Sequence, residues 1–183
     1  MRNLIFALVA VLFSCLFLTS CLKYDKETIH LTLNPRSGNG EISYFVENIT
    51  SDEKAPEKQA SEIQELLKDT KKGKYEKEWK EMGLKSIKSK LTKKDNGNYD
   101  GKISGRFSSL SMLCWKGELI REYKMDNKSL HMDFSSSDFP STIIIESKIP
   151  ILMSNASTPS ENKLNHTWTF APKQRRLVFI EFQ

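Results

Sequence analysis

Cys21 is the residue of this chain whose type and setting point most directly to a chemical step. It ends the run Leu18-Thr19-Ser20-Cys21, which follows a basic residue at Arg2 and an apolar stretch over residues 4–17. A basic start, a short apolar core and small residues before a cut are the parts of a secretory signal peptide. With cysteine directly after the cut, the pattern is a lipobox. We therefore expect residues 1–20 to be removed and Cys21 to be lipidated, with palmitate among the acyl groups.

Two other interpretations of the same segment are weaker. An uncleaved membrane anchor needs about 20 apolar residues, whereas this run is shorter and ends in Thr19-Ser20-Cys21. Cys15 also follows a serine, but Phe13 is bulky and cleavage there would shorten the apolar core. More than one acyl chain on Cys21 would give stable membrane attachment.

The predicted anchor also indicates a location. A lipidated Cys21 places the mature chain in a bacterial cell envelope, and no later apolar segment is long enough to span a bilayer. Leu22, and not an aspartate, follows the anchor. We therefore expect the outer membrane more than the inner membrane in a cell that has both.

Beyond Cys21, the residue types that carry chemistry form no catalytic or metal-binding pattern. His30, His131 and His166 each fall in a strand-like alternation and lack a partner at metal-ligand spacing. The sequence holds no Gly-x-Ser-x-Gly elbow, no phosphate-binding glycine loop and no Cys-x-x-Cys. We therefore predict a protein that is not an enzyme and that uses no cofactor and no metal.

Cys114 is the one free thiol expected in the mature chain. It lies in the apolar stretch Ser111-Met112-Leu113-Cys114-Trp115, with no histidine or second cysteine nearby in sequence. A buried structural cysteine fits this setting better than a reactive thiol. Because one cysteine cannot form an internal disulfide, the fold must rest on its apolar core.

The formal net charge of +5 comes from lysines that are spread along the chain. Two interpretations remain open: a solvated surface, or a lysine-rich face on anionic lipid headgroups beside the anchor. Nucleic acid is not an expected partner, because the basic residues lack interleaved aromatics.

Hydrophobic periodicity predicts the elements of the mature chain. Ile29, Leu31 and Leu33 alternate with polar residues, and the turn-rich segment 34–40 precedes a second strand over 42–49, so the chain opens with a β-hairpin. Helical spacing predicts a helix over 56–70 and a short helical segment over 75–82. Further strands are expected over 99–107, 118–125, 129–134, 142–149, 166–170 and 176–182. Residues 84–91 fit a helix end or a strand, and 150–165 fit a long polar loop.

This order of elements predicts an α+β fold: a mostly antiparallel twisted sheet with one or two helices packed on one side. Residues 21–27 are expected to form a short tether and residues 28–183 a single domain. The sequence shows no regular alternation of strands and helices, which would have favoured a parallel sheet.

Two groups of residues are candidates for binding a ligand or partner. Tyr75 and Trp79 are four residues apart, so both lie on one helix face. Ile151, Leu152 and Met153 lead from an apolar run directly into the polar loop. Core packing is the alternative role for both groups.

The chain resembles the LppM-like domain of bacterial envelope lipoproteins. The resemblance rests at the front on Leu31, Leu33, Asn34, Pro35, Gly38 and Gly40, and near the end on Pro150, Ser154, Asn155, Asn165, Trp168 and Phe170. The family pattern usually has an acidic residue where this chain has Arg36 and favours glycine where it has Ile151. The resemblance implies an α+β domain with an apolar concavity and possible lipid recognition, and it supplies no catalytic residues.

Two functions follow as expectations. The first is a non-catalytic binding module, anchored through Cys21, for an envelope lipid or for a host or envelope partner. The second is a purely structural envelope lipoprotein without a ligand. A deep apolar cavity between helix and sheet would favour lipid binding, and a filled core would favour the structural role.

Overall fold

The computed structural model describes residues 22–117, 119–126 and 128–183. The predicted signal peptide and Cys21 lie outside these ranges. Within them, none of the helices combines the length and the apolar character needed to cross a bilayer.

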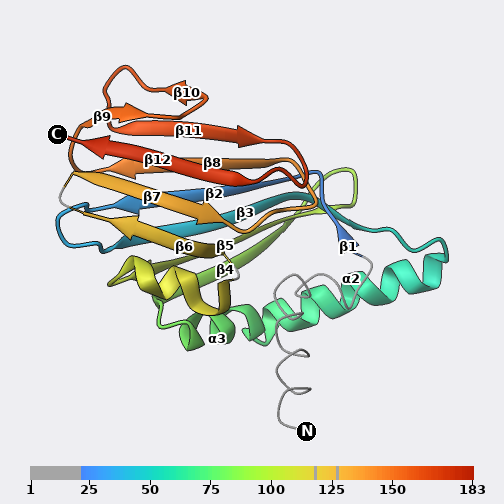
Figure 1. Ribbon diagram of the computed structural model, residues 1–183. Helices are drawn as coiled ribbons and strands as arrows, with labels where there is room; N and C mark the ends of the chain where they lie inside the picture. The colour runs from blue at the N-terminus through green and yellow to red at the C-terminus, as the bar shows by residue number, and fades with distance from the viewer. Residues whose placement is uncertain (1–21, 118, 127) are drawn as a thin grey trace, which may run out of the picture.

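The larger of two sheets is built around the opening hairpin (Figure 1). Its strands pair antiparallel, except that β2 and β8 pair in parallel, with Ile29 opposite Ile143. In spatial order they are β10 (Thr158–Pro159), β11 (Asn165–Phe170), β8 (Ser141–Ser147), β2 (Lys26–Leu33), β3 (Gly40–Ser51), β5 (Tyr99–Phe107) and β4 (Lys85–Lys93), while β1 (Leu22–Lys23) pairs with the end of β3.

A second, smaller sheet is wholly antiparallel. Its order is β6 (Ile120–Met125), β7 (Ser129–Phe134), β12 (Arg176–Phe182) and β9 (Ile151–Ser154). Alternate residues of β12 are buried, which is the pattern of a strand with one face on a core. The last strand of the chain therefore lies between β7 and β9 and joins distant parts of the sequence.

Two helices and a 3-10 segment complete the structure. Helix α2 (Pro56–Lys71) begins with a proline in its first turn and carries basic residues in its last turn, both favourable positions. Gly73 has a φ of 68°, a left-handed conformation that glycine adopts without strain, and it leads into α3 (Lys74–Glu81). The 3-10 segment η2 (Leu110–Gly117) precedes β6.

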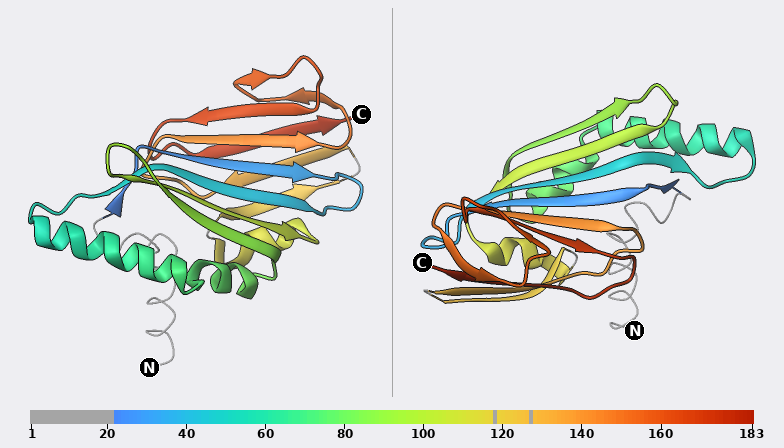
Figure 2. Two further views of the ribbon diagram at one scale, coloured as in Figure 1. Left: turned by 180° about the vertical axis from the view of Figure 1, so that it is seen from behind. Right: turned by 90° about the horizontal axis from the view of Figure 1, so that it is seen from above.

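The helices and the smaller sheet cover the same face of the larger sheet. Ile29, Leu31 and Leu33 of β2 are buried and pack with residues of β7 and β12. Paired residues share a face, so Ile42, opposite Leu31, and Gly105, opposite Ile42, point the same way. On that face α2 and α3 lie against the β3–β5–β4 end, which Figure 2 shows splayed away from the smaller sheet.

The α+β prediction is confirmed, with differences in detail. The chain forms two sheets where one was expected, and one strand pair is parallel. Of the segment 84–91, which fits a helix end or a strand by sequence, residues 85–91 belong to strand β4 and Leu84 precedes it. The expected polar loop over 150–165 is wrong in part, because it contains β9 and β10.

The expected tether is also built into the domain from its first described residue. Leu22 pairs with Ser51 and is 8% exposed, and Tyr24 is 9% exposed. The chain therefore enters the fold at the end of β3 next to α2.

Candidate functional site: an apolar cavity between helices and sheets

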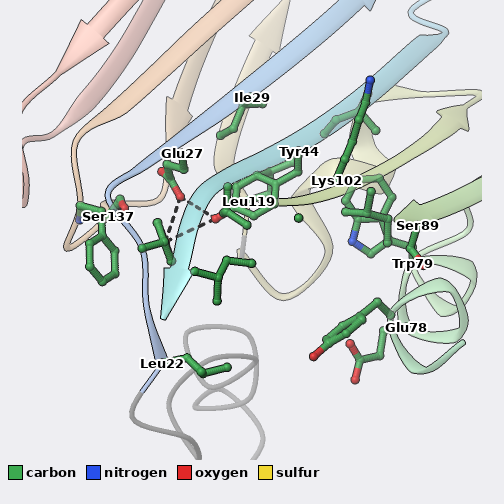
Figure 3. A pocket seen from close by; sticks show the side chains of 18 of the residues that line it. Leu22, Glu27, Ile29, Tyr44, Glu78, Trp79, Ser89, Lys102, Leu119 and Ser137 are labelled. Atoms are coloured by element: carbon green, nitrogen blue, oxygen red, sulfur yellow. Dashed lines mark hydrogen bonds between the residues drawn. The ribbon is translucent and has the colours of Figure 1, made fainter. Parts of the chain in front are cut away.

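A cavity of about 610 Å³ lies between the two helices, the inner face of the larger sheet and the loop after β7. This volume is within the range of small-molecule sites, about 300–1,000 Å³. Its wall is mainly apolar and includes Leu22, Ile29, Ile42, Val46, Ile49, Leu66, Trp79, Met82, Leu84, Leu91, Ile103, Leu113, Leu119 and Phe139. The cavity is open to solvent, and Figure 3 shows side chains from several elements converging on it.

The cavity exists because the apolar residues form two clusters. The main cluster fills the space between the sheets, and the second contains Leu22, Tyr24, Val46, Ile49 and Leu66 beside α2. The second cluster therefore forms at the splayed end of the sheet, beyond the reach of the smaller sheet. Tyr44 packs against both clusters, so its ring lies at their boundary.

Glycines on β5 let the cavity wall close up. A Cβ on Gly101 would lie 3.0 Å from Ile49 Cδ1 and from Val46 Cγ2, and one on Gly105 would lie 3.4 Å from Trp79 Cε3. A glycine inside a strand is typical of a bulge or of a close approach by another group, and here the structure has a close approach. The tightest contact of a Cβ at residue 105 would be with Leu84 Cδ2, at 3.2 Å, so Gly105 leaves room for the residue that connects α3 with β4.

Helix α3 contributes an aromatic and acidic wall to the cavity. Trp79 is 6% exposed, Tyr75 is half-buried, and both line the cavity as residues on one helix face. Burial raises the pKa of Tyr75 to about 12. Glu78 lies beside them, with Oε2 buried and without a hydrogen-bond partner among the described residues, and burial raises its pKa.

A buried polar cluster also lines the cavity. Arg176 Nη1 donates to Glu27 Oε1 and, over 2.9 Å, to Ser141 Oγ. The hydroxyls of Tyr44 and Tyr24 donate to Glu27 Oε2 over 2.6 and 3.3 Å. In Figure 3, Glu27 and Ser137 lie on one side of the cavity, whereas Glu78, Trp79 and Ser89 lie on the other.

The tyrosines of this cluster stay protonated. Burial raises the pKa of Tyr24 to about 12, and burial together with the neighbouring Glu27 carboxylate raises the pKa of Tyr44 well above its ordinary value. Both hydroxyls are therefore hydrogen-bond donors at neutral pH. Among the described lining residues no histidine is present, and no group of His, Cys, Asp or Glu in the described ranges has the arrangement of a metal site.

The other sequence candidates lie away from the cavity. Ile151 is 1% exposed and belongs to the main core, while Leu152 and Met153 are 55% and 53% exposed on β9, in the smaller sheet. None of these three residues is among the described residues that line the cavity. Cys21 lies outside the described residues, although its neighbour Leu22 lines the cavity.

Two residues of the late motif, Asn155 and Trp168, bind each other. Trp168 Nε1 donates to Asn155 Oδ1 over 2.8 Å, and the same oxygen accepts the Phe179 backbone N–H over 2.8 Å. Asn155 thus ties β11 to β12 and has a structural role.

Two of the sequence candidates, Tyr75 and Trp79, line the cavity, whereas the residues of the polar cluster are not among those candidates. Glu27 is assigned to the tether above, and Arg176 stands at the start of the last strand, 149 residues away. The signal that could have exposed Glu27 is its place one residue before the alternating run 28–33, where the strand pattern makes it inward-facing.

The comparisons with known proteins include a distant structural likeness. No family model matches the chain, and no curated protein matches it. The fold is similar to the NMR structure of the folded domain of LppM from Mycobacterium tuberculosis, with 9% sequence identity over 90% of each chain and a TM-score of 0.43.

Proposed function

We propose that this protein is a lipid-anchored bacterial envelope lipoprotein of LppM-like type whose domain binds a lipid or a similar apolar ligand without catalysing a reaction. The observation that carries the proposal is the open apolar cavity of about 610 Å³ between α2, α3 and the sheets. A pocket of this size with a few convergent polar groups is the usual form of a site for an apolar ligand.

The first described residues, Leu22 and Lys23, support a link between the predicted anchor and the cavity. Leu22 and Lys23 line the cavity and pair with the end of β3. Consecutive Cα atoms are about 3.8 Å apart, so an acylated Cys21 holds the cavity next to the membrane. An outer-membrane location is part of the proposal.

Native mass spectrometry of the chain from Leu22 to Gln183 tests ligand binding. The expected result is co-purified lipid, or uptake of added envelope lipid in a one-to-one complex. A ligand-free spectrum after such addition would refute the proposal and favour the purely structural lipoprotein.

A pair of tryptophan variants on α2 locates the ligand. Thr70 lines the cavity and Lys68 is exposed and does not, so Thr70→Trp should reduce uptake by about tenfold or more while Lys68→Trp keeps it. Equal uptake by both variants would place the ligand elsewhere.

The anchor has a separate test in cells that make the full chain. Cys21→Ala should abolish labelling by a palmitate analogue and release the protein from the membrane fraction. Labelling that persists in this variant would refute the assignment of Cys21.

A further inference from the structure

We infer that the ligand of this cavity is an acyl lipid with an uncharged, hydrogen-bonding head group, such as an acylglycerol, held at the Glu27–Arg176 cluster. The inference rests on the proposed function and adds the chemical class of the ligand. It comes from three observations on the polar part of the cavity wall: a pair whose charges cancel, an unsatisfied donor, and nearby hydroxyls.

The two charges of the cluster already neutralise each other. The side chains of Glu27 and Arg176 are each 5% exposed and are joined by a direct hydrogen bond. Tyr24 and Tyr44 complete the partners of the carboxylate. A ligand phosphate or carboxylate at Arg176 would lie close to the Glu27 carboxylate, and a ligand ammonium at Glu27 would lie close to the guanidinium. Either charge would lose its water and gain no net partner.

One donor of the cluster is left over. Arg176 Nε is buried and has no hydrogen-bond partner among the described residues, although Arg176 as a whole is 4% exposed and lines the cavity. A buried donor without an acceptor is costly. An ester carbonyl or a hydroxyl oxygen of a ligand would satisfy this N–H without bringing a charge.

Hydroxyl groups beside the cluster offer the complementary contacts. Ser136 and Ser137 line the cavity on the loop after β7. Ser136 Oγ accepts from Arg121, and Ser137 Oγ accepts the backbone N–H of Phe139 over 3.2 Å. The Ser137 hydroxyl also hydrogen-bonds with Tyr24. Because a serine hydroxyl both accepts and donates, Ser136 retains a proton for a ligand oxygen.

The rest of the described wall adds no net preference for a charged ligand. The remaining cationic lining residues are Lys23, Lys90 and Lys102, and the remaining anionic ones are Asp52, Glu78 and Asp138. All are exposed except the half-buried Glu78. In Figure 3, Lys102 extends its amino group away from the other labelled side chains. The apolar wall therefore selects the acyl chain, and the neutral cluster selects the head group.

Photo-crosslinking of the full chain in phosphatidylcholine vesicles tests the inference. Three probes share one diazirine-bearing palmitoyl chain and differ in the head group: glycerol, phosphate or trimethylammonium. Crosslinks on cavity-lining peptides are quantified by mass spectrometry. The glycerol probe should give at least about tenfold more product than either charged probe.

The outcomes separate the two proposals. A charged probe that equals or exceeds the glycerol probe would overturn the head-group inference and leave lipid binding intact. If no probe labels the cavity peptides, the proposed function fails, and the inference fails with it.

A charge-removing variant supplies a second readout. Glu27→Gln leaves the Arg176 charge unbalanced, so the yield of the phosphate probe relative to the glycerol probe should rise by about tenfold. The matched control is Glu161→Gln, which changes the same residue type at an exposed position outside the cavity and should leave the ratio unchanged. An unchanged ratio in a folded Glu27→Gln protein would overturn the inference. If that variant does not fold, the yield of the glycerol probe relative to the charged probes in the unmodified chain still tests the inference.

Discussion

Arg176→Met should destabilise the domain strongly, because it removes one partner of a buried ion pair. The substitution keeps an unbranched side chain of similar length but leaves the Glu27 carboxylate, 5% exposed, without its cation. Such a loss costs about 3–5 kcal/mol. The Tyr24 and Tyr44 hydroxyls still donate to the carboxylate, which favours the lower value, about 3 kcal/mol.

This cost is large relative to the stability of a domain, which is typically about 5–15 kcal/mol. At about 2–4 °C for each kcal/mol in a domain of this size, the melting temperature should fall by about 6–12 °C. Urea unfolding of the chain from Leu22 to Gln183, followed by tryptophan fluorescence, measures the change in the free energy of unfolding. If the slope of the unfolding free energy against urea concentration is the same in both proteins, the substitution has changed only the stability.

Arg106→Met is the matched control. Arg106 donates to Glu41 over 2.8 Å, but the two side chains are 67% and 58% exposed. Exposed pairs contribute little, so this variant should stay within about 1 kcal/mol of the unmodified chain. If Arg176→Met costs no more than Arg106→Met, the argument that Glu27 depends on a buried cation is wrong.

The double variant isolates the interaction itself. Glu27→Gln in the Arg176→Met background removes the uncompensated carboxylate, so the double variant should cost at least about 1 kcal/mol less than the sum of the single variants. Additive costs would mean that the two side chains act independently.

Three further results are expected. Asn155→Ala should cost about 1–3 kcal/mol in urea unfolding, because Trp168 Nε1 and the Phe179 N–H both lose their acceptor; a change below about 0.5 kcal/mol would contradict that role. Burial lowers the pKa of His166, so the unfolded histidine takes up a proton first as the pH drops below about 6.5, and the free energy of unfolding should fall there. His166→Gln should make this free energy less dependent on pH. An equal pH dependence in the variant and the unmodified chain would refute the prediction. Burial raises the pKa of Cys114, so iodoacetamide should alkylate the folded chain at least about tenfold more slowly than the urea-unfolded chain. Similar alkylation rates would contradict the assignment of Cys114 as a structural thiol.

Local patterns were sufficient where one face of an element is buried. The alternation at Ile29, Leu31 and Leu33 predicts β2, and the structure buries all three residues. Helical spacing after Pro56 likewise predicts α2 to within one residue of its end. In these segments the period of the apolar residues and the neighbouring turn chemistry agree, so tertiary contacts do not change the outcome.

Long-range pairing decides the elements that local patterns missed. Strand β9 has one buried residue, Ile151, followed by exposed Leu152 and Met153, so its sequence shows no alternation. It is a strand because it pairs with β12, with Ser154 opposite Ile180. The parallel pairing of β2 with β8 also joins distant segments, and no local signal marks such a neighbour.

The cavity follows from the same division between local and long-range order. Helical periodicity predicts that Tyr75 and Trp79 share a face, but it cannot tell whether that face meets a filled core. The outcome depends on β4 and β5, which extend the larger sheet beyond the smaller one, so only α2 and α3 cover that end. Each helix has one buried residue, Leu66 on α2 and Trp79 on α3, so the two helices cannot fill the space above β3, β5 and β4. The apolar space left between the two clusters is therefore a consequence of the architecture, and it lies where the chain from Cys21 enters the domain.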